Sequence, residues 1–462
     1  MALSTTIARA LRSKLAGAVV GADDAGYDER RQVWNGAIDR RPCAIACCLD
    51  AGDVQHALRV AREHGVRVTV RGGGHNVAGL ALVDGALLVD LSGMREVRVD
   101  AARRAAHIGG GAAWSDVDAA TSAFGLATTG GLISSTGVGG FTLGGGAGWL
   151  MRRHGLACDN LLSARLVQAD GHLVQVDAAT QPDLFWALRG GAGGLGVVTS
   201  FELRLHPVDT VRAGLLIFDG AQAAAVLRRF RDVVADAPDE CCAMAVMTNA
   251  PPLPFLAGEW HGRPVCIVAV CCTGEAGIGE RFVDALRQAG TPVADHVGPM
   301  PYVEWQRKLD PSAPRGRQQY WKNVNFERLD DAAIDAIARA SLRRPTPFTE
   351  LHVQHMGGAV ARVAASETAF TQRGARYFVN LLGAAETASE FDGLRAWIRS
   401  LSDQLSVHAL PGRMPNFSDG DDPDAALRTG GDHARRLQAL RARFDPDGLF
   451  ANPRHASADG GS

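Results

Sequence analysis

Glycine is concentrated in three short segments of the first half of the chain, and these segments constrain the fold more than any other feature. The first reads RGGGHN, residues 71–76, and follows a strand-like run from Val66 to Val70. Because glycine has no Cβ and can adopt positive φ, the backbone of such a segment can lie against a phosphate or a flat ring. The sequence therefore predicts that a ligand approaches the backbone beside His75.

Two further segments extend this pattern. Residues 137–148 read GVGGFTLGGGAG, with seven glycines, and residues 190–196 read GGAGGLG, with five. Flexible linkers combine glycine with polar residues, whereas Val138, Phe141 and Leu195 are apolar. We therefore expect buried, shaped loops that hold one long, extended ligand at several points.

The third segment contains a G-x-G-x-x-G motif from Gly191 to Gly196, which is the fingerprint of dinucleotide binding in Rossmann folds. That fingerprint requires a strand before the glycines and a helix after them. Here a short helical run, Leu184 to Arg189, comes first, and a strand-like run, Val197 to Leu205, follows. The inverted order argues against a Rossmann unit and against tightly bound NAD(P)H.

The charge balance indicates the kind of partner. Lys and Arg number 48 and Asp and Glu number 50, so the formal charge of the 462-residue chain is −2. Without a basic block, nucleic acid and anionic membranes are not expected as partners, which leaves a small-molecule substrate. No run of 18 or more apolar residues is present, so no transmembrane helix is predicted.

The nine cysteines are odd in number and form no C-x-x-C motif. Neither a disulfide framework nor a zinc site is indicated, and no other metal site is predicted. The N-terminal residues 1–34 lack an uninterrupted apolar core and a cleavage site, so we expect an ordinary first helix rather than a signal peptide. A cytoplasmic location is therefore expected.

Helical and strand-like patterns alternate along the chain and indicate a strand-rich α+β protein. Residues 53–65 have helical spacing, and Asp170-Gly171 is expected to form the turn of a hairpin. After Pro207, strands alternate with long helices, which indicates a second domain. The predicted division is a first domain of residues 1–207, a second of 208–415, and a C-terminal segment of 416–462 that packs back onto the first.

These residues resemble a family, the vanillyl-alcohol oxidase and p-cresol methylhydroxylase type flavoproteins, and within it the berberine-bridge-enzyme-like branch. The resemblance covers most of the chain. It is carried by WNG at 34–36, RGGGHN at 71–76, LVDLS at 88–92, TGVGG at 136–140, GWL at 148–150, DLFWALRGG at 183–191 and GVVT at 196–199.

The resemblance implies a two-domain FAD-binding fold whose second domain is an antiparallel sheet covered by helices. It implies FAD joined covalently to His75 through the 8α carbon of the flavin. The residues that it places against FAD are Arg71, Gly72, Gly73, Gly74, His75, Asn76, Gly79, Ser134, Gly137, Gly139, Gly140, Gly144, Gly145, Gly146, Gly148, Asp159, Asn160, Gly196, Val198, Asn416 and Asn452.

The chain departs from the family pattern at three places. Many relatives attach the flavin a second time through a cysteine at the position of Ile133, so a single attachment is implied here. Relatives often carry a catalytic tyrosine where this chain has Met414, and methionine cannot take a proton. The family's last asparagine-rich motif is eroded to FANPRH at 450–455.

With the usual tyrosine missing, either the substrate is acidic enough to lose its proton unaided or another residue is the base, and three residues are candidates. Tyr320 lies in a stretch similar to one that lines the substrate side in relatives. Glu350 and His352 are two residues apart on a predicted strand, so they share one face with Gln354. Histidine is the side chain that ordinarily titrates near neutral pH, which suits a general base.

The sequence and the resemblance together predict an FAD-dependent oxidase that takes a hydride from a small alcohol or amine and passes the electrons to O2. Two alternatives stay open. One is a flavin-dependent oxygenase or oxidative cyclase of secondary metabolism, and the other is a flavin-binding protein without turnover. The substrate is not predicted, and a homodimer remains an alternative to a monomer.

Overall fold

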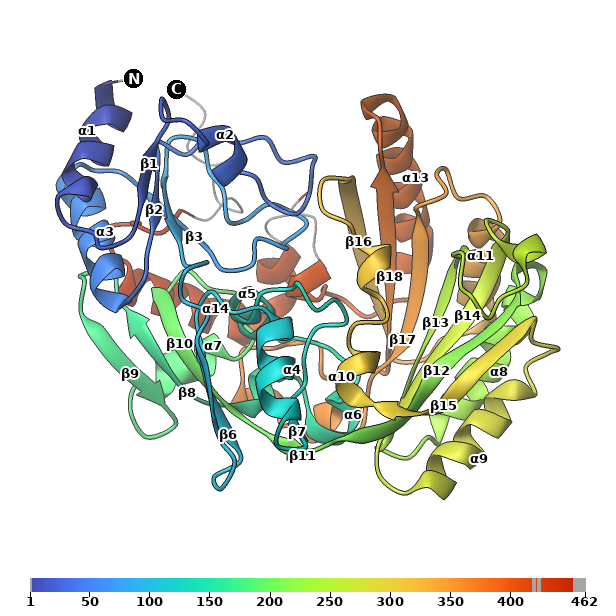
Figure 1. The fold of residues 1–462 in the computed structure, drawn as a ribbon. Coiled ribbons are helices and arrows are strands. Elements are labelled where there is room, and N and C mark those ends of the chain that lie inside the picture. The colour runs from blue at the N-terminus through green and yellow to red at the C-terminus, as the bar shows by residue number, and fades with distance from the viewer. Residues whose placement is uncertain (1, 418–420, 422–424, 452–462) are drawn as a thin grey trace.

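The strands form two groups that lie side by side in space, one from each half of the chain (Figure 1). The structure is a computed structural model that describes residues 2–417, 421 and 425–451. The first half contains α1 (Ala2–Arg12), β1 (Val19–Gly21), α2 (Tyr27–Arg30), β2 (Ala44–Cys47), α3 (Ala51–Glu63), β3 (Val68–Arg71), β4 (Leu87–Asp90), β5 (Val97–Asp100), β6 (Ala105–Gly109), α4 (Trp114–Ser122), β7 (Leu126–Ala127), α5 (Val138–Leu143), α6 (Met151–His154), β8 (Leu161–Val167), β9 (Leu173–Asp177), α7 (Pro182–Leu188), β10 (Val197–Arg204) and β11 (His206–Pro207).

A four-stranded sheet positions the first glycine segment. Its order is β1-β2-β4-β3, and β4 pairs in parallel with both β2 and β3. The apolar runs of β2 and β4 are buried throughout, as expected for strands covered on both faces. Strand β3 ends at Arg71, so the sheet delivers Gly72 and the residues after it to one edge.

A five-stranded antiparallel sheet, of order β5-β6-β10-β8-β9, positions the third glycine segment. That segment leads from α7 into β10, which is the helix-then-strand order expected from the sequence. The second segment differs from the expected loop, because residues Val138–Leu143 form α5. Glycine disfavours helix, but Val138 and Phe141 are buried in this half of the core, and their packing offsets the low propensity.

The second half is built on a seven-stranded sheet of order β15-β12-β14-β13-β17-β18-β16, and every pairing is antiparallel. Its strands are β12 (Thr210–Asp219), β13 (Cys241–Asn249), β14 (Pro264–Cys272), β15 (Ala294–Pro301), β16 (Gln318–Phe326), β17 (Glu350–His355) and β18 (Tyr377–Ala385). Helices α8 (Ala223–Ala235), α9 (Ala276–Arg287), α11 (Asp331–Ser341) and α13 (Ala388–Ser406) cover one face (Figure 1), and two short helices are α10 (Tyr302–Trp305) and α12 (Ala359–Arg362). The antiparallel sheet covered by helices agrees with the predicted α+β fold.

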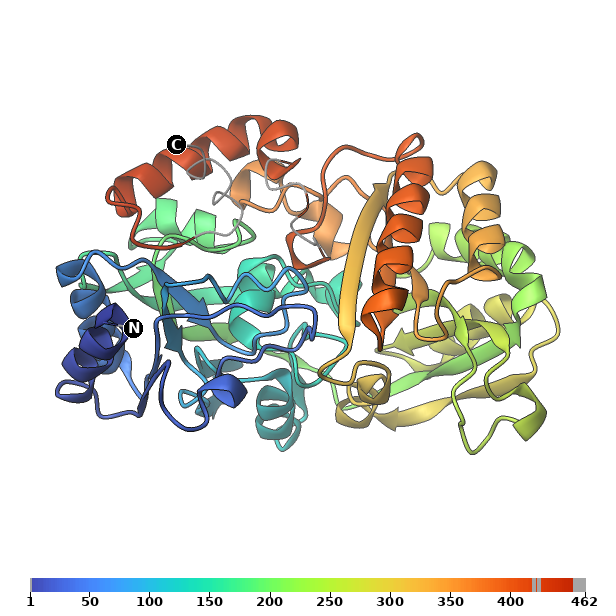
Figure 2. The same ribbon diagram turned by 90° about the horizontal axis from the view of Figure 1, so that it is seen from above.

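The last helix returns to the first half. Helix α14 (Ala425–Phe444) lies over the first half when the molecule is seen from above (Figure 2). It contacts α7, and its Leu440 is buried in the core of the first half. Arg436 forms an ion pair of 2.8 Å with Asp183 of α7. No helix of the described residues is long and apolar enough to cross a bilayer.

A buried carboxyl lies where α4 of the first half meets the segment after α10. Asp118 is 4% exposed, and Gln306 donates a hydrogen bond of 3.4 Å to it. Burial raises the pKa of Asp118 to about 7, although the Gln306 bond opposes the shift. In the unfolded chain this carboxyl ionises at lower pH than in the folded protein. The free energy of unfolding therefore falls as pH rises toward 7, by on the order of 4 kcal/mol.

We therefore expect Asp118→Asn to raise the melting temperature at about pH 9 and to change it little at about pH 4, where the folded carboxyl is neutral like the amide. Thermal unfolding of the two proteins across this pH range checks the expectation. A gain of the same size at both pH values would show that folding does not raise the pKa of Asp118.

Candidate active site

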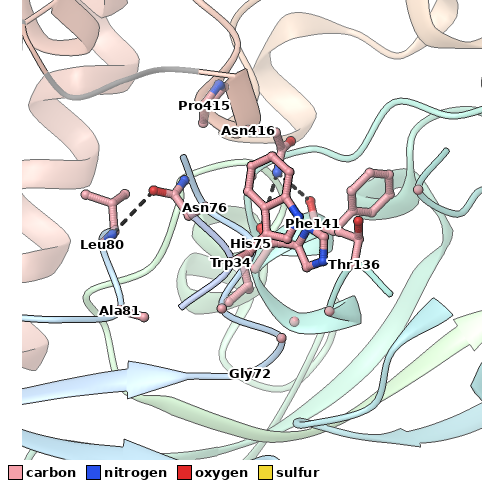
Figure 3. Close-up of a pocket in the computed structure, with 18 of the residues that line it drawn as sticks. Trp34, Gly72, His75, Asn76, Leu80, Ala81, Thr136, Phe141, Pro415 and Asn416 are labelled. Atoms are coloured by element: carbon pink, nitrogen blue, oxygen red, sulfur yellow. Dashed lines mark hydrogen bonds between the residues drawn. The ribbon is translucent and has the colours of Figure 1, made fainter. Parts of the chain in front are cut away.

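A cavity lies between the two halves and brings the glycine segments together with strands β16, β17 and β18 of the seven-stranded sheet. Gly72, Gly137 and Gly194 line it from the first half, and Glu350 and His352 line it from β17. Figure 3 shows the part around His75, where Asn416 of the C-terminal segment closes one side. The three segments that the sequence singled out thus belong to one site.

The first two glycine segments touch each other through their backbones. A Cβ built on Gly73 would lie 2.4 Å from the backbone nitrogen of Gly137, and a Cβ on Gly137 would lie equally close to the nitrogen of Gly73. No side chain fits in that space. Gly140 and Gly193 are different, because a Cβ there would meet nothing within 4 Å and would project into open space beside the cavity that both residues line.

His75 is held in a fixed orientation at this point. Its Nε2 lies 2.9 Å from Oγ of Ser135, and its ring stacks on Trp34 with centroids 5.1 Å apart (Figure 3). The Trp34 indole in turn donates a hydrogen bond of 3.1 Å to the carbonyl of Ala313. Burial, assisted by the Arg315 charge, lowers the pKa of His75 to about 4. The imidazole is therefore neutral at pH 7, and its Nδ1 is the nitrogen not bound to Ser135.

A carboxylate and an imidazole face the cavity from β17. Nε2 of His352 lies 2.7 Å from Oε2 of Glu350, and Thr248 donates a hydrogen bond of 3.0 Å to Oε1 of Glu350. Burial raises the pKa of Glu350, but the bonds from His352 and Thr248 and the Arg344 charge outweigh it, so that pKa is lowered. Glu350 is thus an ionised acceptor that orients His352 and leaves its Nδ1 available.

The cavity collects most of the residues predicted to touch a ligand. Those that line it are Gly72, Gly73, Gly74, His75, Asn76, Gly137, Gly139, Gly140, Gly144, Gly196, Val198 and Asn416, together with the predicted bases Glu350 and His352. Asn416 also fixes the second segment, because its Nδ2 donates to the carbonyl of Phe141 at 3.2 Å. Asn452 lies outside the described residues.

Four predicted glycines pack against protein instead of lining the cavity. They are Gly79, Gly145, Gly146 and Gly148. A Cβ on Gly148 would lie 1.9 Å from the carbonyl oxygen of Gly130, and one on Gly145 would lie 2.7 Å from the Phe370 ring. Close packing accounts for glycine at these positions, and their contact with a ligand stays a prediction.

Arg71 and Ser134 are likewise held by protein partners. Arg71 forms a buried ion pair of 2.6 Å with Asp90 of β4. The hydroxyl of Ser134 donates a hydrogen bond of 2.6 Å to Asp310, and its backbone N–H donates to the same carboxylate at 2.7 Å. Neither residue lines the cavity, and their direct contact with a ligand stays a prediction.

Asp159 and Asn160 stabilise the turn before β8. Asp159 pairs with Arg373 at 2.6 Å. Asn160 donates to the carbonyl of Leu156 at 2.9 Å, and its Oδ1 lies 2.7 Å from Nε2 of His206. Neither residue lines the cavity, and their contact with FAD stays a prediction.

Tyr320 lies on the opposite side of the seven-stranded sheet from the cavity. Its neighbours Gln319 and Trp321 line the cavity, whereas Tyr320 belongs to the core beneath the covering helices. Its hydroxyl is hydrogen-bonded to Asp421, and Arg399 of α13 donates to it at 2.8 Å. The geometry therefore favours Glu350 and His352, which line the cavity, over Tyr320 as the base.

Met414, at the family's tyrosine position, is fully buried and does not line the cavity. Several residues that do line it carried no site prediction. They are Trp34, Ile133, Gly193, Gly194, Trp321, Phe348, Asn380 and Phe417. The signal for Gly193 and Gly194 was present in the third glycine segment, whereas Trp321, Phe348 and Asn380 reach the cavity only through strand pairing.

Comparisons with known proteins agree with a flavin site. A family described as FAD binding domain matches residues 42–177. An FAD-linked oxidoreductase of Dictyostelium discoideum is 27% identical over 91% of this chain and 89% of its own length. The (R)-6-hydroxynicotine oxidase of Paenarthrobacter nicotinovorans is 34% identical over 62% of each chain. The solved 6-hydroxy-D-nicotine oxidase from Arthrobacter nicotinovorans covers 95% of this chain and 97% of its own, with a TM-score of 0.84 and 26% identity.

Proposed function

The chain belongs to the berberine-bridge-enzyme-like FAD-linked oxidoreductases of the vanillyl-alcohol oxidase and p-cresol methylhydroxylase superfamily, and on that premise we propose that it oxidises a small molecule with O2 as acceptor. When bound, FAD would accept a hydride from a substrate C–H bond and pass the electrons to O2, giving hydrogen peroxide. The observation that carries the proposal is one cavity that joins the glycine segments to Glu350 and His352.

The residues present fit FAD. Gly140 and Gly193 leave free the space that a Cβ would fill. A long and partly flat ligand needs this space to lie against the backbone. We assign contacts with FAD to the lining residues of the three segments, to Val198 and to Asn416. In this assignment residues 1–207 and 416–462 hold the cofactor, and residues 208–415 cover its reacting end and bind the substrate.

His75 is the proposed site of a covalent bond to FAD. A neutral imidazole is a competent nucleophile, and the pKa of about 4 keeps His75 neutral across the physiological range. Because Ser135 holds Nε2, the bond would form through Nδ1. Ile133 lines the cavity where relatives carry cysteine, and none of the nine cysteines does, which supports a single attachment.

His352 is the proposed general base. Its Nδ1 would take a proton from the substrate O–H or N–H, while the ionised Glu350 holds Nε2 and stabilises the imidazolium that forms. This pair replaces the tyrosine that the family often places at the position of Met414. A retained acid–base pair inside the cavity favours turnover over simple flavin binding.

Oxygen consumption tests the proposal. The purified yellow protein should consume O2 with at least one member of a panel of sugars, amines and phenolic or polyketide alcohols, and should release one hydrogen peroxide for each O2. An oxygenated product without peroxide would instead support the flavin-dependent oxygenase. A yellow protein that reacts with no member of a broad panel would support flavin binding without turnover.

A further inference from the structure

Three polar side chains form a row across neighbouring strands at the substrate end of the cavity. His352 of β17 pairs with Asn380 of β18, and Asn380 pairs with Asn323 of β16. Cross-strand partners share one face of a sheet. Alternate residues of β18, Asn380, Leu382 and Ala384, line the cavity, so the Asn380 side chain lies on the cavity face next to His352.

The orientation of the Asn380 amide follows from a backbone donor. The backbone N–H of Met414 donates a hydrogen bond of 2.9 Å to Oδ1 of Asn323. A backbone N–H cannot act as an acceptor, so this bond fixes which way the Asn323 amide points. Nδ2 of Asn323 then donates to Oδ1 of Asn380 at 3.0 Å. The oxygen of Asn380 is occupied, and its nitrogen is the group left to face the cavity.

That nitrogen has no partner among the described residues, although Asn380 is fully buried. A buried amide N–H without an acceptor costs free energy comparable to a lost hydrogen bond, so such groups are rare unless something binds them. The cross-strand neighbour of Asn380 on β17 is the proposed base His352. An acceptor atom between the two would satisfy the free N–H of Asn380.

We propose that Asn380 donates a hydrogen bond to the substrate oxygen or nitrogen that loses its proton to His352. The proton moves from that heteroatom to Nδ1 of His352, and the electron pair of the broken O–H or N–H bond stays on the heteroatom. Asn380 keeps its own proton and stabilises the negative charge. The inference rests on the proposed function, and it selects substrates with an ionisable O–H or N–H beside the oxidised carbon.

Binding of a matched pair of probes tests the role of Asn380. Pentafluorophenol is an anion at neutral pH, and pentafluorobenzene has the same ring without the oxygen. Fluorine-detected NMR gives the affinity of each probe for the FAD-containing protein, for Asn380→Leu and for Asn380→Asp. The aspartate variant keeps the acceptor for Asn323 but turns a carboxylate oxygen toward the probe.

We expect the wild-type protein to prefer the phenolate over pentafluorobenzene by roughly 10- to 100-fold, as for a hydrogen bond to a charged group. The preference should fall to about twofold or less in Asn380→Leu and should not recover in Asn380→Asp. Wild-type protein that shows no preference, or that binds neither probe, would overturn the inference, as would a preference that Asn380→Leu retains.

The flavin content and melting temperature of each sample show that the variants are folded. These controls also separate two failures. Protein without flavin, or flavin protein that forms no peroxide with any substrate, counts against the proposed oxidase. Flavin protein that forms peroxide but binds the two probes equally counts against Asn380 alone.

Discussion

His352→Ala lowers the rate of flavin reduction by about 10²- to 10⁴-fold, the usual contribution of a general base. The loss is expected because His352 faces the cavity and Glu350, 2.7 Å from its Nε2, leaves Nδ1 to accept the proton. Single-turnover reduction under anaerobic conditions measures the step before O2 reacts.

Two further variants make the test of His352 specific. Glu350→Gln keeps an acceptor for His352 but removes the charge that stabilises the imidazolium, so we expect a smaller loss than with His352→Ala. Because the pKa of Glu350 is lowered, the stabilisation that its charge gives the imidazolium is complete at pH values above the ordinary carboxyl range. This stabilisation is lost as pH falls through the pKa that Glu350 has in the folded protein. Tyr320→Phe serves as the matched control, since Tyr320 lies across the sheet from the cavity.

A different base, or none, would be evident in the same measurements. Reduction rates within about threefold of wild type in His352→Ala and Glu350→Gln would indicate that the substrate ionises unaided. A large loss in Tyr320→Phe with His352→Ala unaffected would contradict the placement of the base on β17.

The second large effect is expected from His75→Ala. In wild-type protein the flavin should stay with the polypeptide after acid precipitation, because His75 is bonded to it, whereas His75→Ala should release all of it. Peptide mapping should place the flavin on the peptide that contains His75 and on its Nδ1, since Ser135 holds Nε2. Ser135→Ala should slow attachment or divide it between the two nitrogens.

Two outcomes would contradict this account of His75. Flavin that remains attached in His75→Ala would show that another residue forms the bond. Flavin that leaves the wild-type protein on acid precipitation would show that the cofactor is bound without a covalent link, although the cavity could still hold it.

The local sequence was sufficient where the chemistry of a segment decides its structure. The strand that carries Glu350 and His352 was predicted, because alternation of polar and apolar residues shows both the strand and its cavity face. The glycine segments were found for a similar reason, since the contact between Gly73 and Gly137 tolerates no Cβ. Composition and spacing carry that information directly.

Other features depend on contacts between distant parts of the chain. Strand β16 has polar residues at buried positions, and the side-chain amides of Asn323 and Asn325 donate hydrogen bonds to Asn380 and to Gln372. Its sequence therefore has no clear alternation, and nothing local shows that Tyr320 faces the helices. The continuous apolar run of β13 does not distinguish a buried strand from a helix by periodicity alone.

The sequence also does not show which glycines of the cavity-forming segments line the cavity and which pack against protein. Gly140 lines the cavity, while Gly146 and Gly148, a few residues later, are required for packing against Phe141 and Gly130. Both uses produce the same residue type in one run. Only the folded structure separates a glycine that admits a ligand from one that admits another part of the chain.

A crystal structure of the yellow protein as purified tests the central claim most directly. We predict electron density for one FAD along the three glycine segments, continuous with the side chain of His75 and reaching the cavity wall formed by Glu350 and His352. A flavin bound elsewhere, or one in this cavity whose ring lies away from β17, would contradict the account.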